Sequence, residues 1–333
     1  MVAVANGNLR LNKALLDSPY SGLSSMVQTT SNWYAPSYVQ IEPTTRCNNR
    51  CVFCIRAPNE NFDISMDLYK SILDQLHCSR FGTKHVDLTG LGEPLLNPNI
   101  VTMIRMIKEK GMRAGFTTNF GPMNKTIARG LLEVGVDYLY VSVDGAKKET
   151  FERMRIGSNF ERTMSAIRTV VELKRELGLK KPHLKMSAVL GSHNMGEILD
   201  MIRLAEDLGM DSISFNRPSG KGYEKAPLPP ISFWENLPKT KIQVSRMAIT
   251  LKHPQPCVAL KGCYITYDGW VLSCNSLFQI MPRSKLVPYI LGDLKKQSLR
   301  EIWQSPNYRK IRTLLSLDMR PNYCSYCPRP YQI

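Results

Sequence analysis

Long apolar runs are missing from this sequence of 333 residues: no window approaches the roughly 18 consecutive apolar residues of a membrane-spanning helix. Residues 1–11 also lack the apolar stretch of a secretory signal. Low-complexity tracts and long internal repeats are absent, and a composition of 43% hydrophobic and 22% charged residues is typical of a globular protein. We therefore expect a globular cytoplasmic protein that has no membrane partner.

Acidic side chains are comparatively few. The chain has 28 Asp and Glu against 44 Lys and Arg, which gives a formal net charge of +16. The basic residues form no block of five or six, so a solvated basic surface is the simplest interpretation. The excess also suits an acidic partner such as nucleic acid, anionic lipid or an electron-carrier protein, and charge alone does not choose among them.

Histidine occurs five times, and none of the histidines has metal-ligand spacing, whereas cysteine occurs nine times. An odd number of cysteines fits a disulfide framework poorly, and disulfides are rare in the cytosol, so metal ligation is the leading explanation. Cys78 stands alone and is most simply a core residue. The others form an early and a late group: Cys47, Cys51 and Cys54, then Cys257, Cys263, Cys274, Cys324 and Cys327.

Between the two cysteine groups, short β-rich runs alternate with longer segments of helical period. The predicted strands are Tyr38–Glu42, His85–Leu88, Arg113–Thr117, Tyr138–Val143, His183–Val189 and Ser212–Asn216. The predicted helices include Ile100–Lys110, Asn124–Glu133, Phe160–Leu177 and Met195–Leu208. Six strand–helix units of about 30 residues each are too few for a complete eight-stranded barrel. The sequence therefore predicts an α/β fold built on a partial (β/α)6 barrel.

The regular alternation stops after Arg217. Residues 218–256 carry several prolines and glycines and are predicted to form a connector with one helix. A small α+β domain is expected to follow, in which Asp268 and Gly269 give a strong signal for a two-residue hairpin turn. Residues 299–315 then return to helical spacing. The expected organisation is an N-terminal arm (1–36), the partial barrel (37–217), the connector (218–256) and the C-terminal domain (257–333).

The first cysteine group forms the pattern C-x3-C-x2-C directly after the first predicted strand. In a parallel barrel this position is the carboxyl-terminal mouth, where active sites collect. Three thiolates can hold three irons of a 4Fe-4S cluster, whereas electron-transfer clusters normally use four cysteines, so one iron stays open for a substrate or cofactor. The alternatives are chance clustering of buried thiols and a structural zinc site, which would need a fourth ligand nearby.

This pattern resembles that of the radical S-adenosylmethionine (SAM) enzymes, which place it after the first strand of a partial barrel. The resemblance implies that Cys47, Cys51 and Cys54 bind a 4Fe-4S cluster and that S-adenosyl-L-methionine binds its open iron. It also implies that the aromatic side chain of Phe53, just before the last cysteine, lines the adenine site.

Three further segments carry the resemblance. Residues 89–94, TGLGEP, are similar to the family's GEP motif, so Gly92, Glu93 and Pro94 are expected to receive the methionyl ammonium, for which a carboxylate is a suitable acceptor. The end of the fourth predicted strand implies that Ser142 contacts the ribose hydroxyls. Arg155 is a candidate for binding the methionyl carboxylate, although an exposed Ser or Arg at such positions is often simply solvated.

The late cysteines, with the DG turn among them, resemble the shortened C-terminal domain, called twitch, of the SPASM branch of the family. Full SPASM domains carry more cysteines and hold two auxiliary clusters. The resemblance therefore implies one auxiliary 4Fe-4S cluster bound by Cys257, Cys274, Cys324 and Cys327. A zinc ribbon is the alternative for four thiols split between a hairpin and a C-x2-C pair.

Cys263 is the surplus thiol of the second group. The simplest interpretation is a buried apolar residue under the hairpin. Alternatively, Cys263 replaces Cys257 as a cluster ligand or donates a hydrogen atom to a substrate radical, which would make it catalytic.

The resemblance implies an enzyme, a radical SAM oxidoreductase, which generates a 5′-deoxyadenosyl radical and abstracts hydrogen from a small polar substrate such as an amino sugar, aminocyclitol or polyol. Net dehydrogenation with electron transfer to the auxiliary cluster is the expected outcome. The alternatives are epimerisation of a similar substrate and modification of a precursor peptide or of RNA. An acidic flavodoxin or ferredoxin is the expected reductant, and nucleic acid is not the expected partner.

Overall fold

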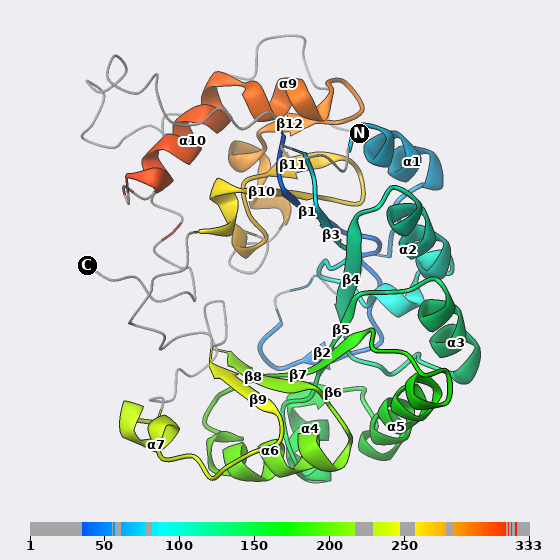
Figure 1. Ribbon diagram of the computed structural model, residues 1–333. Helices are drawn as coiled ribbons and strands as arrows, with labels where there is room; N and C mark the ends of the chain where they lie inside the picture. The colour runs from blue at the N-terminus through cyan, green and yellow to red at the C-terminus, as the bar shows by residue number, and fades with distance from the viewer. Residues whose placement is uncertain are drawn as a thin grey trace.

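In the described part of the protein, a large curved sheet carries helices on its convex face, and a separate two-stranded sheet accompanies it (Figure 1). The computed structural model describes residues 35–54, 56, 61–76, 82–216, 229–246, 257–277, 283–317, 319, 321 and 324. The sheet has ten strands in the order β12-β11-β10-β1-β3-β4-β5-β7-β8-β9, and all neighbours from β10 to β9 are parallel. The mixed α/β fold with a large parallel sheet is therefore confirmed.

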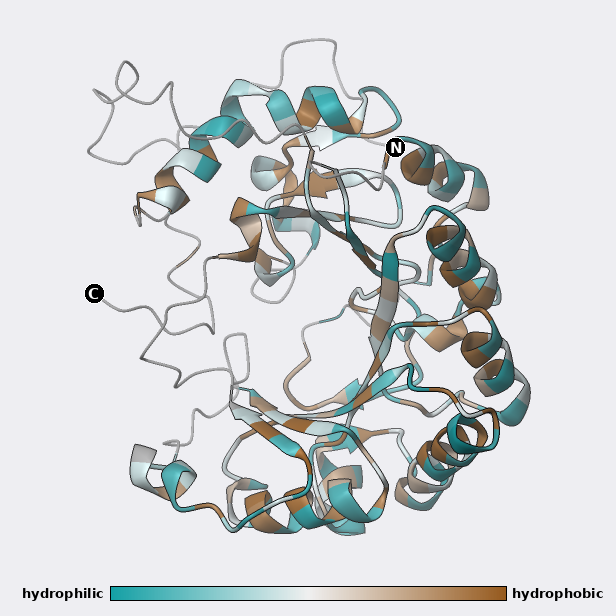
Figure 2. Cartoon of the chain, viewed as in Figure 1, coloured by the Kyte–Doolittle hydropathy of each residue, from teal (hydrophilic) through white to brown (hydrophobic). Residues whose placement is uncertain are grey.

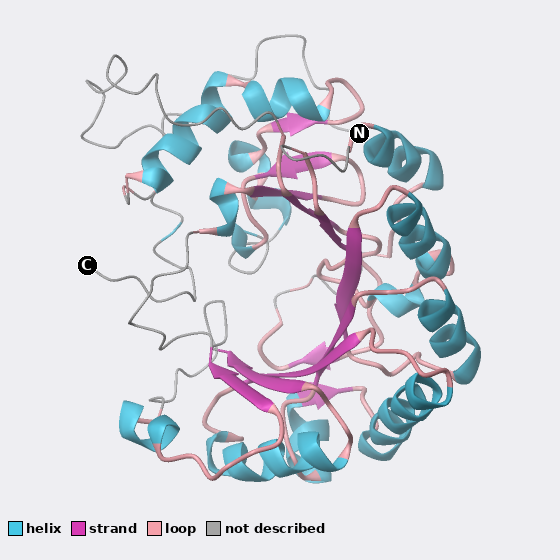
Figure 3. Ribbon diagram, in the orientation of Figure 1, coloured by secondary structure: helices cyan, strands magenta, loops and turns pink. Residues whose placement is uncertain are grey.

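The strands that build the barrel wall match the six predicted ones to within one residue at their ends. They are β1 (Tyr38–Ile41), β3 (His85–Asp87), β4 (Arg113–Thr118), β5 (Tyr138–Ser142), β7 (His183–Val189) and β8 (Ser212–Asn216). The barrel sheet is long and open, and it curves through the molecule as a single surface with its carboxyl ends at one rim (Figure 3).

Helices pack on the outside of this sheet, with their apolar faces toward it (Figure 2). Polar N-caps start several of them; for example, the Asn124 and Asn159 side chains each accept a backbone N–H of the first turn. No helix among the described residues combines the length and apolarity needed to cross a membrane. The helices are α1 (Met66–Asp74), α2 (Ile100–Glu109), α3 (Lys125–Glu133), α4 (Lys148–Met154), α5 (Phe160–Glu176), α6 (Ile198–Asp207), α7 (Ile231–Glu235), α9 (Leu299–Gln304) and α10 (Pro306–Ser316).

The segment expected to be only a connector contributes to the sheet. It contains the predicted single helix, α7, but also β9 (Gln243–Arg246), which pairs parallel with β8. The four residues of β9 are mostly polar because the strand lies at the edge of the sheet, so its sequence lacks the apolar run typical of a buried strand. The wall therefore continues one strand beyond the predicted six.

The C-terminal hairpin is joined directly to the barrel. β10 (Gly262–Ile265) pairs parallel with β1, and β11 (Trp270–Leu272) and β12 (Gly292–Asp293) follow it antiparallel. The hairpin turn differs from the expected two-residue form: Thr266 N–H donates to the Trp270 carbonyl, and Gly269 N–H donates to the Thr266 carbonyl. With Gly269 at φ +91°, this is a three-residue loop closed by a left-handed glycine.

The last helical segment is interrupted. Residues 299–315 are divided into α9 and α10 because Ser305 is extended, with ψ 148°, and Pro306 begins the second helix. Proline cannot continue the hydrogen bonding of a preceding helix but fits the first turn of a new one. The hydroxyl of Ser305 then accepts the N–H of Tyr308 and caps α10.

Candidate active site

The three early cysteines lie in the loop that leaves the carboxyl end of β1. Within this loop, β2 (Arg50–Cys51) pairs antiparallel with β6 (Arg155–Ile156), so that Cys51 lies opposite Arg155. The Cys54 N–H donates to the Cys51 carbonyl at 3.0 Å, which turns the last cysteine back toward the second. The pairing fixes the loop at the mouth of the barrel, as predicted for an active site.

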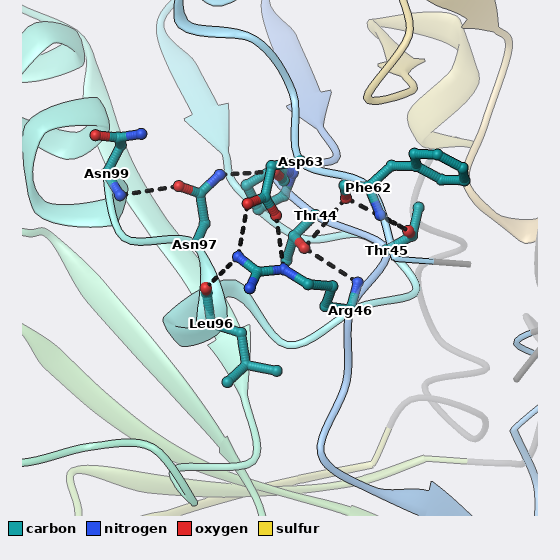
Figure 4. Close-up of polar contacts among 9 residues, drawn as sticks. Thr44, Thr45, Arg46, Phe62, Asp63, Leu96, Asn97 and Asn99 are labelled. Carbon is teal, nitrogen blue, oxygen red and sulfur yellow. Dashed lines mark hydrogen bonds and ion pairs between the residues drawn. The ribbon is translucent and has the colours of Figure 1, made fainter. Parts of the chain in front are cut away.

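Arg46, next to the first cysteine, ties three chain segments together (Figure 4). Its guanidinium donates two hydrogen bonds to Asp63, of 3.1 and 2.6 Å, and a third to the Leu96 carbonyl at 2.6 Å. The backbone N–H of Arg46 also donates to the Thr44 hydroxyl at 3.0 Å. A bidentate pair of this kind fixes orientation as well as distance, so the start of the cysteine loop is well defined.

Each of the three sulfur atoms accepts a hydrogen bond from nitrogen. Asn49 and Arg56 backbone N–H groups lie 3.5 Å from the sulfurs of Cys47 and Cys54, and an Arg155 guanidinium nitrogen lies 3.8 Å from that of Cys51. Donors around sulfur are typical of cysteines that bind metal clusters as thiolates, because they stabilise the negative charge on the ligands.

Burial favours the protonated form of the Cys47 and Cys51 thiols in the protein alone. Burial raises the pKa of Cys47, and it raises the pKa of Cys51 to about 11, with further repulsion from the neighbouring thiols. Loss of the proton therefore requires a metal, as in other thiolate sites. Among the described residues, no three His, Cys, Asp or Glu side chains converge on a single metal ion.

The GEP segment packs directly against the cysteine loop. A Cβ atom added to Gly92 would lie 2.3 Å from the Thr44 carbonyl oxygen and 2.6 Å from that of Arg46. The next residue, Glu93, donates its N–H to the Arg46 carbonyl at 2.7 Å, and Pro94 begins a short 3₁₀ turn. The glycine is thus needed for this close backbone approach.

The Glu93 carboxylate is buried and already hydrogen-bonded. It accepts from the Leu95 and Asn119 N–H groups and from the Thr118 hydroxyl, and burial raises its pKa to about 7. These contacts join the segment to the carboxyl end of β4. Binding of a methionyl ammonium at Glu93 stays a prediction, and the observed contacts add a structural role.

Arg155 is buried between the second cysteine and a strand end. Its guanidinium is paired with Asp144 at 2.6 Å and lies 5.7 Å from the centre of the Phe53 ring. The structure therefore brings Cys51, Phe53 and Arg155 together, although their sequence positions lie about a hundred residues apart. Ser142 ends β5, two residues before Asp144. The predicted ribose and carboxylate contacts of Ser142 and Arg155 stay predictions.

Two of the predicted auxiliary ligands pack against the same apolar cluster near this site. Cys274 and Cys324 pack on a small apolar cluster that also contacts Leu91 of the GEP segment. Cys257 lies at the start of a 3₁₀ turn before β10. Cys327 and Cys78 lie outside the described residues.

Cys263 is oriented away from the barrel interior. In the parallel pairing of β10 with β1 it lies in register with Val39, a core residue of the helix-covered face, and it is 2% exposed. Burial raises the pKa of the thiol to about 12. This placement favours the core interpretation of Cys263 over the role of a hydrogen donor.

Glu42 is a candidate that the sequence motifs did not indicate. It follows β1, is fully buried, and accepts the N–H groups of Leu91 at 3.1 Å and Tyr267 at 3.4 Å. One carboxylate therefore links the GEP segment with the C-terminal hairpin. A Glu five residues before the first cysteine, Cys47, has no distinctive spacing, so only the tertiary contacts show its position.

Glu42 makes a testable contribution to the pH dependence of stability. Burial raises its pKa from 4.5 to about 7, so the folded state holds a proton that the unfolded state releases, and stability falls as pH rises through this range. Replacing Glu42→Gln should reduce the loss in the free energy of unfolding between pH 5.5 and 7 by about 2 kcal/mol. Urea unfolding of the anaerobic protein measures this loss.

Glu301→Gln is the matched control for this experiment. Hydrogen bonds from Ser298 lower the pKa of Glu301, so it titrates below the window and its replacement should leave the slope unchanged. An equal slope for Glu42→Gln and the unmodified protein would contradict the assignment.

Comparison with known families agrees with this site. Residues 41–205 match the model of the radical SAM superfamily, and residues 257–328 match that of the SPASM iron-sulfur cluster-binding domain. The chain belongs to the radical SAM superfamily and carries a SPASM domain. Membership implies a SAM-binding 4Fe-4S cluster, S-adenosyl-L-methionine and auxiliary iron–sulfur binding, in agreement with the sequence-based prediction.

Two curated relatives are similar over nearly the whole chain. The chain is 25% identical to a tungsten-containing aldehyde ferredoxin oxidoreductase cofactor-modifying protein of Pyrococcus furiosus, over 87% of this chain and 86% of that protein. It is 26% identical to an AdoMet-dependent heme synthase of Methanosarcina barkeri, over 88% and 89%.

Solved structures share the fold. SuiB of Streptococcus suis, bound to S-adenosylmethionine, gives a TM-score of 0.68 at 17% identity, covering 89% of this chain and 72% of that one. The structure of anSMEcpe with bound AdoMet and a peptide gives 0.61 at 16% identity, covering 87% and 85%.

Proposed function

We propose that this protein is a radical SAM oxidoreductase that removes hydrogen from a small polar molecule. Bound to the three early cysteines, the cluster supplies the electron that cleaves S-adenosyl-L-methionine and so provides a hydrogen-abstracting radical. The amino sugars, aminocyclitols and polyols expected from the sequence are the proposed substrate class, with net dehydrogenation as the proposed outcome.

The observation that carries the proposal is that the loop carrying Cys47, Cys51 and Cys54 packs against the GEP segment and Arg155 at the barrel mouth. In this arrangement Arg46 and the β2–β6 pair orient the cysteine loop, Gly92 allows the close backbone approach, and Arg155 balances the negative charge of the ligands. These residues bind and position; none of them has to transfer a proton.

Dehydrogenation needs an acceptor for the second electron. Cys274 and Cys324 pack in one cluster with Leu91, so an auxiliary cluster held there, with Cys257 and Cys327 as its further ligands, would lie next to the SAM-binding segment. The net charge of +16 supports an acidic flavodoxin or ferredoxin as the reductant, since opposite charge steers association.

The relatives that span the whole chain support a small-molecule substrate, because one is named for cofactor modification and the other for heme synthesis. A precursor peptide is the second candidate. It is supported by the fold of SuiB, which was solved with its precursor peptide SuiA, at a TM-score of 0.66 and 16% identity over 84% of this chain and 67% of that one.

The test is anaerobic turnover with SAM, a reductant and a panel of amino sugars, aminocyclitols and polyols. The proposal expects one class to stimulate 5′-deoxyadenosine formation and to yield a product lighter by two hydrogen atoms. Stimulation by peptides alone would replace this proposal with the peptide-modifying function.

The Cys263→Ala variant separates dehydrogenation from epimerisation. Because the thiol lies in the core on the helix-covered face, the variant should keep most of the activity, and product formed in D2O should carry no deuterium at the reacting carbon. Loss of turnover with both clusters intact, together with one deuterium in the unmodified enzyme's product, would favour the epimerase.

A further inference from the structure

The concave face of the sheet is polar and retains contact with solvent. Along β7, Leu184, Met186 and Ala188 face the helices and are buried, whereas the alternating residues are partly or fully exposed. Because strand residues alternate between faces, Lys185 and Ser187 lie on the concave side, with Tyr140 and Ser142 in register on β5. A sealed barrel core would instead be filled by bulky apolar side chains.

The amino-terminal end of this face is closed by aromatic side chains. The Tyr138 hydroxyl contacts His85 Nε2 at 2.7 Å and donates to Asp87, and the rings of His85 and Tyr38 meet edge to face at 5.2 Å. Tyr138 reaches across β4 because the intervening residue is Gly115, where a Cβ would lie 2.6 Å from its ring. These contacts form a floor beneath the mouth.

Two charged groups lie above this floor. The Lys185 ammonium lies 3.4 Å from the centre of the Tyr140 ring, and no described residue gives it a hydrogen bond or an ion pair. Asp87 is 7% exposed, its Oδ2 atom accepts from the Tyr138 hydroxyl, and Thr89 lies close enough to lower the pKa of the carboxyl by hydrogen bonding. Its Oδ1 atom has no close hydrogen-bond partner among the described residues. The two charges influence each other, since Asp87 opposes the lowering of the Lys185 pKa by burial.

A charged side chain that is partly removed from water without an ion pair destabilises the folded protein, and a bound ligand of opposite charge would remove this destabilisation. Lys185 is only partly buried, so it keeps part of its hydration, and the cation–π contact of about 0.5–2 kcal/mol offsets only part of what burial removes. An anionic oxygen bound to Lys185 would supply the missing ion pair, and a hydroxyl or amino group of the same molecule would supply a donor for Asp87.

We propose that Lys185, Tyr140 and Asp87 form a substrate-binding site on the floor of the barrel, and that the substrate carries a carboxylate or phosphate group next to a hydroxyl or amino donor. This proposal rests on the proposed function, because it places the substrate between the floor and the SAM-binding mouth. The binding site therefore restricts the proposed class of small polar substrates to those that carry a negative charge.

The experiment measures how fast each lysine of the cluster-loaded enzyme is acetylated by a succinimidyl ester, using mass spectrometry of peptides. Acetate and inorganic phosphate are the probes, and potassium chloride at equal ionic strength is the control for screening. At about twice its Kd, a probe should slow Lys185 acetylation about threefold, because one third of the sites stay empty. Exposed Lys84 serves as the internal reference.

The outcomes separate the possibilities. Protection by acetate alone identifies a carboxylate substrate, and protection by phosphate alone identifies a phosphorylated one. Equal slowing by chloride, or no slowing of Lys185 relative to Lys84, would overturn the proposal. Formation of 5′-deoxyadenosine in the same sample reports separately on the proposed function, so failure of the floor site and failure of radical SAM chemistry are distinguishable.

Discussion

Replacing Cys47, Cys51 and Cys54 with alanine should halve the iron content of the reconstituted protein and abolish 5′-deoxyadenosine formation. Two 4Fe-4S clusters hold about eight iron atoms, and only one depends on the loop after β1. Among the described residues, the groups that hydrogen-bond to the three sulfurs are N–H donors, which do not bind iron and cannot replace the thiolates. Iron analysis and chromatography of the SAM cleavage products measure the two effects.

The matched variant replaces Cys274 and Cys324 with alanine. It should remove a similar amount of iron, yet leave reductive cleavage of SAM in the absence of substrate, since the early cysteines are unchanged. Stoichiometric zinc with little iron in the unmodified protein would contradict the two-cluster assignment, as would equal loss of SAM cleavage in both variants.

The parallel sheet was predictable because its central strands are covered on the outer face. Residues such as Val141 and Met186 are fully buried there, and they alternate with polar residues on the concave side. This alternation of apolar and polar residues is typical of β-strands and is visible in the sequence. β9 was not predicted because a strand at the edge of a sheet needs no apolar run, and its four residues are mostly polar.

The candidate site also has a part that the sequence predicts and a part that only the structure shows. The cysteine pattern and the GEP segment are local in sequence, and short spacing was enough to predict that they lie at the mouth. Glu42 and the pair of Asp87 with Lys185 could not be predicted, because their environments are assembled from three or more strands and from the hairpin. Single polar residues in strands give no spacing signal, and only the register identifies which of them face inward.

Replacing Gly92 with alanine should weaken SAM binding strongly, although Gly92 has no side chain that could contact SAM. In Gly92→Ala the new methyl group would meet the Thr44 and Arg46 carbonyl oxygens at 2.3 and 2.6 Å. Both are backbone atoms, which cannot rotate away as a side chain can, so the two loops must separate. Separation breaks the hydrogen bond from the Glu93 N–H to the Arg46 carbonyl and moves the GEP segment away from Cys47.

A displacement of this kind typically costs about 2 kcal/mol, which corresponds to roughly thirtyfold weaker SAM binding if the binding geometry bears the cost. Equilibrium binding of SAM to the cluster-loaded variant measures the effect. Gly196→Ala is the control, because the same methyl group meets nothing within 4 Å there, and it should change affinity by less than about twofold. If Gly92→Ala bound SAM as tightly as Gly196→Ala, the contact between the GEP segment and the cysteine loop would not control the SAM site.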